Sequence, residues 1–164
     1  KLWPHVWQMA TRLECIENVG DWLEYSNLGR AVIVTRTAQG VRAFHNACRH
    51  RGVPLVPIGG YGNARTQGFI CPFHGWRWNT EGKNTFVYGR HLFDERQLDE
   101  GDLRLRECRV EEALGCAWIN WDDSAPGLRS RKLPSSTISA ALRMRASCSE
   151  AGMPRIRKGK RMFS

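Results

Sequence analysis

Two short motifs each pair a cysteine with a histidine, and both lie in segments rich in glycine and proline. The first, CRHRG, contains Cys48 and His50, and the second, CPFHGW, contains Cys71 and His74. Thiolates and neutral imidazoles are ligands of zinc and of iron–sulfur centres, so these four side chains could form a complete ligand set. Zinc-finger sites usually pair Cys with Cys and His with His, whereas each motif here offers one of each. The mixed pairing favours a two-metal cluster in which both motifs hold both metals, although zinc stays an alternative.

Two cysteines on one iron and two histidines on the other are the ligands of a Rieske [2Fe–2S] centre. The motifs resemble the two cluster loops of Rieske non-heme iron oxygenases, the α subunits of aromatic-ring-hydroxylating dioxygenases. The resemblance runs from about Trp7 to Leu128 and includes FDERQLDEGDLRLRECRVEEALGCAWINWDDSAPGL. It implies that Cys48 and Cys71 hold the inner iron and that His50 and His74 hold the outer, solvent-edge iron. The 20 residues between His50 and Cys71 slightly exceed the family's usual spacing, and a surface hairpin can absorb the extra ones.

The residues beside the four ligands are expected to shape the surroundings of the cluster. Glycine follows each His closely, where we expect a side chain to crowd the cluster or the facing loop. Respiratory-chain Rieske proteins carry an extra Cys in each loop, and this chain has Val53 and Phe73 at those positions. They also place hydroxyl groups after the second His-Gly, where this chain has two tryptophans. The expected surrounding residues are Arg49, Gly52, Phe73, Gly75, Trp76 and Trp78.

A cluster with few hydrogen bonds to its sulfur atoms is harder to reduce. The tryptophans offer no hydroxyl, so the sequence predicts a reduction potential in the low part of the Rieske range. Such a potential suits electron delivery to an oxygen-activating iron and does not suit oxidation of a quinol.

The rest of the first 126 residues predicts an all-β fold, an antiparallel β-sandwich with both cluster loops at one tip. Strands rich in Trp, Val, Ile and Thr alternate with turn signals such as NVGD and TAQG. We expect the Rieske domain to span residues 1–126, with the cluster-binding core at about 31–90. A short helix is expected over Asp94–Glu100. The expected strands are Trp7–Ile16, Trp22–Tyr25, Ala31–Thr37, Val41–Asn46, Gly68–Ile70, Trp76–Asn79, Arg104–Glu111 and Cys116–Trp121.

The net charge of +9 belongs to the C-terminal stretch, because residues 127–164 hold ten basic residues and one acid. This Ser/Arg-rich tail has no sustained hydrophobic period and predicts disorder. We expect it to be a solvated end, so a nucleic-acid partner is not expected. Its abrupt start near Leu128 suggests a frame shift or a truncated gene, with a genuine basic tail as the alternative.

The ring-hydroxylating family also carries a mononuclear iron held by two His and one carboxylate. His91 is the last histidine, so this sequence cannot supply that site, and catalytic residues are not expected in it. The resemblance implies a Rieske electron-transfer domain that takes electrons from a ferredoxin or flavin reductase and passes them to mononuclear Fe(II) in full-length relatives. Those relatives are expected to form homotrimers or α/β oligomers. A stand-alone Rieske-type ferredoxin and a zinc-binding interaction module are the alternatives.

The remaining cysteines and histidines are expected to have no ligand role. His5, His45 and His91 are interpreted as ordinary surface or core residues, and Cys15, Cys108 and Cys116 as small buried side chains in strands. The irregular Cys spacing predicts a reducing, cytoplasmic compartment rather than a disulfide framework. No run of 18 apolar residues is present, so a membrane span is not expected.

Overall fold

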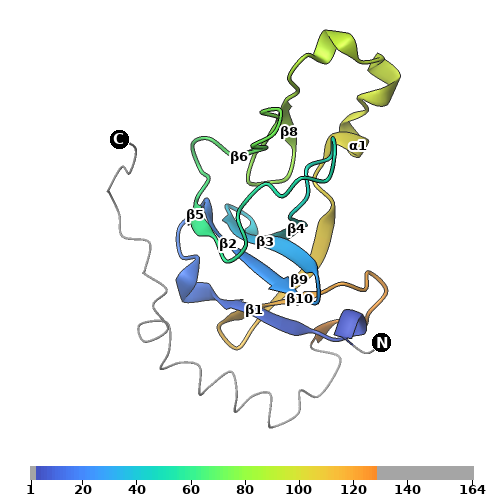
Figure 1. Ribbon diagram of the computed structural model, residues 1–164. Coiled ribbons are helices and arrows are strands. Elements are labelled where there is room, and N and C mark those ends of the chain that lie inside the picture. The colour runs from blue at the N-terminus through green and yellow to red at the C-terminus, as the bar shows by residue number, and fades with distance from the viewer. Residues whose placement is uncertain (1–2, 129–164) are drawn as a thin grey trace.

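Ten β-strands form two antiparallel sheets in the computed structural model, which describes residues 3–128 (Figure 1). The larger sheet has seven strands in the order β1-β10-β9-β4-β3-β2-β5, and the smaller has three in the order β6-β7-β8. The strands are β1 (Gln8–Arg12), β2 (Asp21–Asn27), β3 (Arg30–Thr37), β4 (Gly40–His45), β5 (Tyr61–Asn63), β6 (Phe69–Ile70), β7 (Arg77–Trp78), β8 (Asn84–Phe86), β9 (Glu107–Ala113) and β10 (Cys116–Asn120). The expected all-β fold is confirmed.

Strand β3 is apolar over residues 31–34, where both of its faces are covered. Successive side chains of a strand point to opposite faces. Val32 and Val34 join one buried cluster, and Ile33 between them joins another, which also contains the two motif cysteines. One face of the large sheet therefore builds its own core, while the other face supports the smaller sheet and the metal-binding motifs.

The large sheet curls until its first strand meets β2. Gln8 of β1 accepts hydrogen bonds on its Oε1 from Tyr25 (3.1 Å) and Asn27 (2.8 Å), both of β2. β1 otherwise pairs with β10 and forms one end of the large sheet. The curled body gives the smaller sheet and its loops a rigid base.

Between β8 and β9 the chain leaves the body as an arm, seen at the top of Figure 1. The arm contains two 3₁₀ turns, η3 (Arg90–Leu92) and η4 (Glu95–Gln97), and one helical turn, α1 (Glu100–Leu103). Asp99 caps α1 by accepting a hydrogen bond from the Gly101 amide. The single helix expected over Asp94–Glu100 is wrong, because the two capping aspartates divide this stretch into two separate turns. Two further 3₁₀ turns, η1 (Trp3–His5) and η2 (Leu13–Cys15), flank β1.

Most expected strands are present, with three differences. The strand expected over Trp7–Ile16 ends at Arg12, where η2 begins. The strand expected to start at Arg104 begins at Glu107. β5 and β8 were not expected, and each has only three residues.

The body extends to Leu128, two residues beyond the expected boundary. Leu128 is 1% exposed and packs with Cys116 and Trp118 of β10. Its amide donates to Glu111. The rest of the expected tail, 129–164, lies outside the described residues. Within residues 3–128, no helix is long and apolar enough to span a membrane.

Candidate metal centre

The first motif follows β4 directly and is fixed by the side chain of Asn46. Its Oδ1 accepts hydrogen bonds from the amides of Leu55 (2.8 Å) and Val56 (3.1 Å), and its Nδ2 donates to the Val56 carbonyl (2.8 Å). Asn46 is buried, so these bonds form away from competing water. They tie the start of the Cys48 loop to the segment that follows it.

The two motifs have the same backbone hydrogen bonds. The amide of Cys48 donates to Val53, and the amide of Gly52 donates back to Cys48. In the second motif, which joins β6 to β7, Cys71 donates to Trp76 and Gly75 donates back to Cys71 (3.0 Å). The two loops therefore hold their Cys and His residues with the same backbone hydrogen-bond pattern. Cys and His are one residue further apart in the second loop.

Gly52 and Gly75 are required by their backbone conformation. Their φ angles are +70° and +69°, in the left-handed region that other residues rarely adopt. No protein atom lies within 4 Å of a Cβ built on either glycine. The facing loop therefore does not crowd these positions, and the left-handed turn favours glycine at both.

The two motif cysteines meet inside the core. Cys48 is 4% exposed and Cys71 is 2% exposed, and neither forms a disulfide. Burial raises the pKa of the Cys48 thiol, and hydrogen bonding with the Cys71 side chain raises it further. Two thiols are thus held together where a thiolate is costly unless a cation balances its charge.

The two motif histidines meet at the edge of the same core. The Nδ1 atoms of His50 and His74 lie 3.1 Å apart, and both side chains are half-buried. Burial lowers the pKa of His50, and the neighbouring His74 and Arg51 lower it further. A lowered pKa favours the neutral imidazole, which is the form that binds metals.

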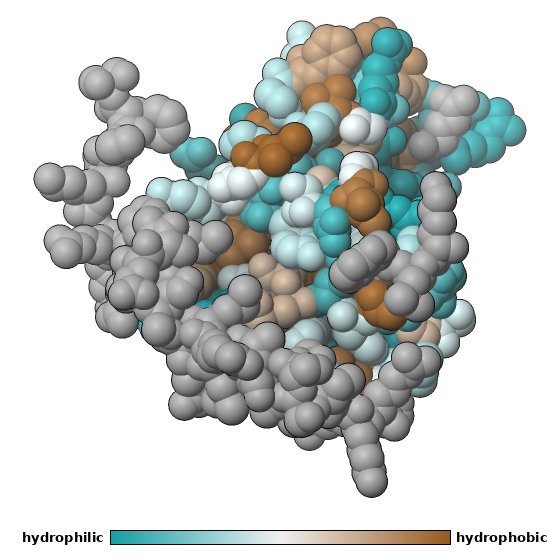
Figure 2. Space-filling view, turned by 60° about the horizontal axis from the view of Figure 1, so that its bottom comes forward, coloured by the Kyte–Doolittle hydropathy of each residue, from teal (hydrophilic) through white to brown (hydrophobic). Residues whose placement is uncertain are grey.

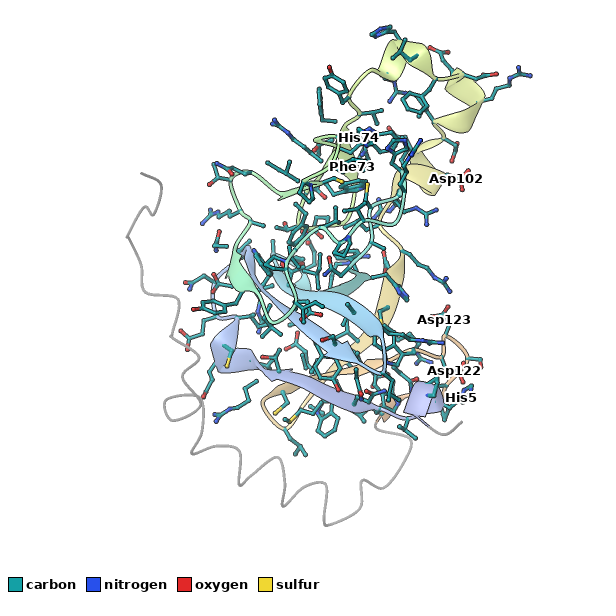
Figure 3. All side chains as sticks on the ribbon, in the orientation of Figure 1. His5, Phe73, His74, Asp102, Asp122 and Asp123 are labelled. Atoms are coloured by element: carbon teal, nitrogen blue, oxygen red, sulfur yellow. The ribbon has the colours of Figure 1, made fainter. Side chains whose placement is uncertain are left out.

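Aromatic rings surround the histidine pair. Trp76 stacks on His50 with ring centroids 4.8 Å apart and planes at 10°, and Phe93 of the arm meets both rings edge-on. Phe73 lies 4.0 Å from His74, centroid to centroid, and is 58% exposed. Figure 3 shows Phe73 and His74 together at the end of the molecule near the arm. His50 is therefore packed between two rings, whereas His74 has the largely exposed Phe73 ring as its aromatic neighbour.

The other expected neighbours connect the loops to the rest of the fold. Arg49 donates through Nε to the Asp102 carbonyl of α1 (2.8 Å), which joins the first loop to the arm. Trp78 is fully buried, and its Nε1 donates to the Leu103 carbonyl (2.7 Å). The arm thus supports both loops.

The four side chains come together as one buried Cys pair and one half-buried His pair. Among residues 3–128, no group of three or more His, Cys, Asp and Glu side chains is placed to hold one metal ion. Two ligands for each of two metals fit a [2Fe–2S] cluster with different ligands on its two irons. The donor set and the charge-poor pocket around the thiols suit this group, whose chemistry is one-electron transfer.

The comparison with protein families identifies the domain in which these four side chains lie. The model of the Rieske [2Fe–2S] domain matches residues 6–87. The chain belongs to the Rieske [2Fe–2S] domain family. Its relatives include the large oxygenase component of the naphthalene 1,2-dioxygenase system of Pseudomonas aeruginosa, 36% identical over 126 residues. Another is the 2-aminobenzenesulfonate 2,3-dioxygenase subunit alpha of an Alcaligenes species, at 32% over 130 residues.

Solved structures agree with this Rieske assignment. A naphthalene 1,2-dioxygenase variant bound to phenanthrene superimposes with a TM-score of 0.70 at 34% identity, over 78% of this chain and 28% of that chain. A quaternary ammonium Rieske monooxygenase reaches 0.71 at 24% identity over 89% of this chain and 38% of that chain, which shows the shared fold. The two curated relatives are matched over 75% and 78% of this chain but only 27% and 32% of their own lengths. The Rieske chain thus spans about a third or less of their length.

The three remaining histidines occupy other positions in the fold. His5 binds Asp122 (2.8 Å) at the opposite end of the molecule (Figure 3). His45 lies against Trp121, and His91 is exposed on the arm. The interpretation of the three as ordinary core or surface residues fits these positions.

Of the other three cysteines among residues 3–128, two are placed as expected. Cys108 of β9 and Cys116 of β10 are buried, and burial raises the pKa of Cys108 to about 12. Cys15 differs, because it is only half-buried and ends a 3₁₀ turn. Sequence reasoning missed Asn46 and Phe93, which no local motif marks.

Proposed function

We propose that Cys48, Cys71, His50 and His74 hold the [2Fe–2S] cluster of this Rieske domain and that the domain transfers electrons for an oxygenase. The observation that carries the proposal is the pairing of the ligands, with both thiols in the core and both imidazoles at its edge. In this assignment the cysteines take the inner iron and the histidines the outer one, which is the iron open to a donor.

The chain's own residues would perform three tasks. The two equivalent loops fix the four ligand atoms, and Trp76 holds the plane of His50. Phe73 covers part of His74 and still leaves the imidazole half-exposed. The cluster itself supplies reversible one-electron reduction when bound.

We propose residues 1–128 as the Rieske domain, with the metal centre in 46–93. A ferredoxin or flavin reductase would supply electrons, and a mononuclear iron outside this sequence would receive them. An oligomer of longer chains is the expected assembly. The absence of hydroxyl side chains at Trp76 and Trp78 supports a reduction potential low in the Rieske range.

Replacing His74 by Cys tests the ligand assignment. A fourth thiolate adds negative charge to the cluster, so the potential should fall from the Rieske range, about −150 to +300 mV, toward that of plant-type clusters near about −400 mV. The average g value in the EPR spectrum of the dithionite-reduced protein should rise at the same time. His91→Cys is the matched control, because His91 is an exposed histidine on the arm.

Unchanged spectra in the His74→Cys protein would remove His74 from the ligand set. Stoichiometric zinc without sulfide in the wild-type protein would overturn the cluster itself. Metal and sulfide analysis therefore precedes the spectroscopy.

A further inference from the structure

Basic residues are concentrated in the segment that carries the metal centre. Residues 46–93 contain six Lys and Arg and one acid, whereas residues 94–128 contain four Lys and Arg and ten acids. Among the described residues, only Lys83 of the six basic side chains forms an ion pair, with Glu100 at 3.4 Å. Within residues 3–128, no ion pair is found for the other five: Arg49, Arg51, Arg65, Arg77 and Arg90.

Arginines elsewhere in the described chain mostly have an acidic partner. Five of them form ion pairs with Asp or Glu: Arg12, Arg36, Arg42, Arg96 and Arg109. The lack of partners is therefore a feature of the segment around the metal centre. Unpaired exposed arginines leave a positive potential that an anionic partner can use.

Two of the unpaired arginines, Arg65 and Arg77, line one open cleft of about 670 Å³. Among the described residues that line the cleft, they are the only charged ones, and both are exposed. Threonine, glutamine and asparagine side chains supply the polar part of the lining: Thr66, Gln67, Asn79, Thr80 and Thr85. The cleft thus offers two guanidinium groups and neutral hydrogen-bonding groups, with no carboxylate to repel an anion.

The cleft adjoins the second cluster loop. Ile70, in its lining, directly precedes Cys71 and pairs with Arg77, which follows His74 by three residues. The guanidinium of Arg77 lies over the Phe86 ring at 5.4 Å, so its direction is partly fixed. A protein bound at this cleft would lie beside the edge formed by the exposed Phe73 and the half-buried His74.

We propose that the cleft of Arg65 and Arg77 binds carboxylate side chains of an acidic electron-donor protein. This inference rests on the proposed function, since a donor is needed only if the centre transfers electrons. Charge complementarity decides the kind of partner: two guanidinium groups pair well with carboxylates. On the face shown in Figure 2, hydrophobic residues lie as separate spots among hydrophilic ones.

The reaction at this surface is a single electron transfer. One electron leaves the reduced donor, which is oxidised, and arrives at the cluster of the Rieske domain, which is reduced. No bond forms or breaks. The arginines act before that step, because they raise the rate of encounter and orient the donor.

The test is the rate of cluster reduction in an Arg65→Gln/Arg77→Gln variant. The probe is a reduced plant-type [2Fe–2S] ferredoxin with a strongly acidic surface, mixed with the full chain in a stopped-flow instrument. We expect the second-order rate constant to fall on the order of 10-fold at low salt. The difference should disappear at about 0.5 M salt, where exposed charges are screened within a few ångströms.

The control is an Arg12→Gln/Arg36→Gln variant, which removes the same charge from arginines that already bind Glu14 and Glu112. Its rate constant should stay within about twofold of the wild type, because these charges lie outside the cleft. Equal losses in both variants, or no loss in the first, would overturn the docking proposal. Dithionite reduction and metal analysis show independently whether each protein holds a reducible cluster. A wild-type protein without such a cluster would contradict the proposed function rather than the docking proposal.

Discussion

His50 and His74 differ in their surroundings although their Nδ1 atoms lie only 3.1 Å apart. His50 is stacked on Trp76 and bordered by Phe93, whereas His74 is bordered by the exposed ring of Phe73. A stacked ring keeps its plane, so the orientation of His50 depends on its neighbour more than that of His74. Removing Trp76 should therefore disturb one ligand selectively.

For Trp76→Ala we expect an altered EPR line shape. Urea unfolding, followed by the absorbance of the cluster, should also have a clearly lower midpoint than in the wild type. Losing a buried Trp costs about 3–5 kcal/mol, and Trp76→Phe should recover part of it because a ring remains. Trp121→Ala is the control, since Trp121 lies against His45, which is outside the proposed ligand set. It should lower stability without changing the EPR signal. The same EPR change in both alanine variants would mean that stacking on His50 has no special role.

At the residue level, the motifs predicted Cys48, Cys71 and the surrounding tryptophans because these lie within a few positions of each other. Phe93 could not be found in this way. It reaches His50 only because the arm folds back over the first loop, a contact between residues 43 positions apart. Contacts of this kind depend on the path of the whole chain.

At the scale of helices and strands, local sequence patterns predicted most strands and the turns between them. The turn signal TAQG separates two of the expected strands, and β3 and β4 pair across it as a hairpin. β5 and β8 each have three residues, and their sequences are no more strand-like than a loop. They pair because β2 and β7 present free edges to them, which no local signal reveals.

The loop after β4 depends on Asn46 as its single buried polar anchor. In Asn46→Ala the amides of Leu55 and Val56 lose their buried acceptor, and unsatisfied groups of this kind cost about 1–3 kcal/mol each. We expect a lower urea midpoint and faster cluster loss. Asn46→Asp keeps both acceptor positions and loses only the donor to Val56, so loop order should be better preserved. Equal cluster retention in wild type and Asn46→Ala would show that the anchor is not needed.

In the whole molecule, basic and acidic residues are concentrated in different segments of the chain. Residues 46–93, the metal-binding segment, have an excess of basic side chains, and among residues 3–128 only Lys83 of these forms an ion pair. Residues 94–128 have an excess of acidic side chains. The acidic part includes ion pairs that stabilise the body, such as Arg36 with Glu112. Net charge alone would have hidden this division, because the first 126 residues sum to zero.

The turn after β10 is tied to the N-terminal segment through Asp122, and this tie should depend on pH. Hydrogen bonds from Ser124 and His5 lower the pKa of Asp122 from 3.8 to about 2. The unfolded chain therefore takes up this proton more readily, so the stabilisation is complete above about pH 4 and is lost as pH falls toward about 2. The difference in urea midpoint between wild type and Asp122→Asn should accordingly shrink as the pH falls from about 4 toward about 2. Asp123→Asn is the control, because no hydrogen bond to the Asp123 carboxylate is found among residues 3–128. A difference for Asp122→Asn that stays constant with pH would mean that its carboxylate contributes through shape rather than charge.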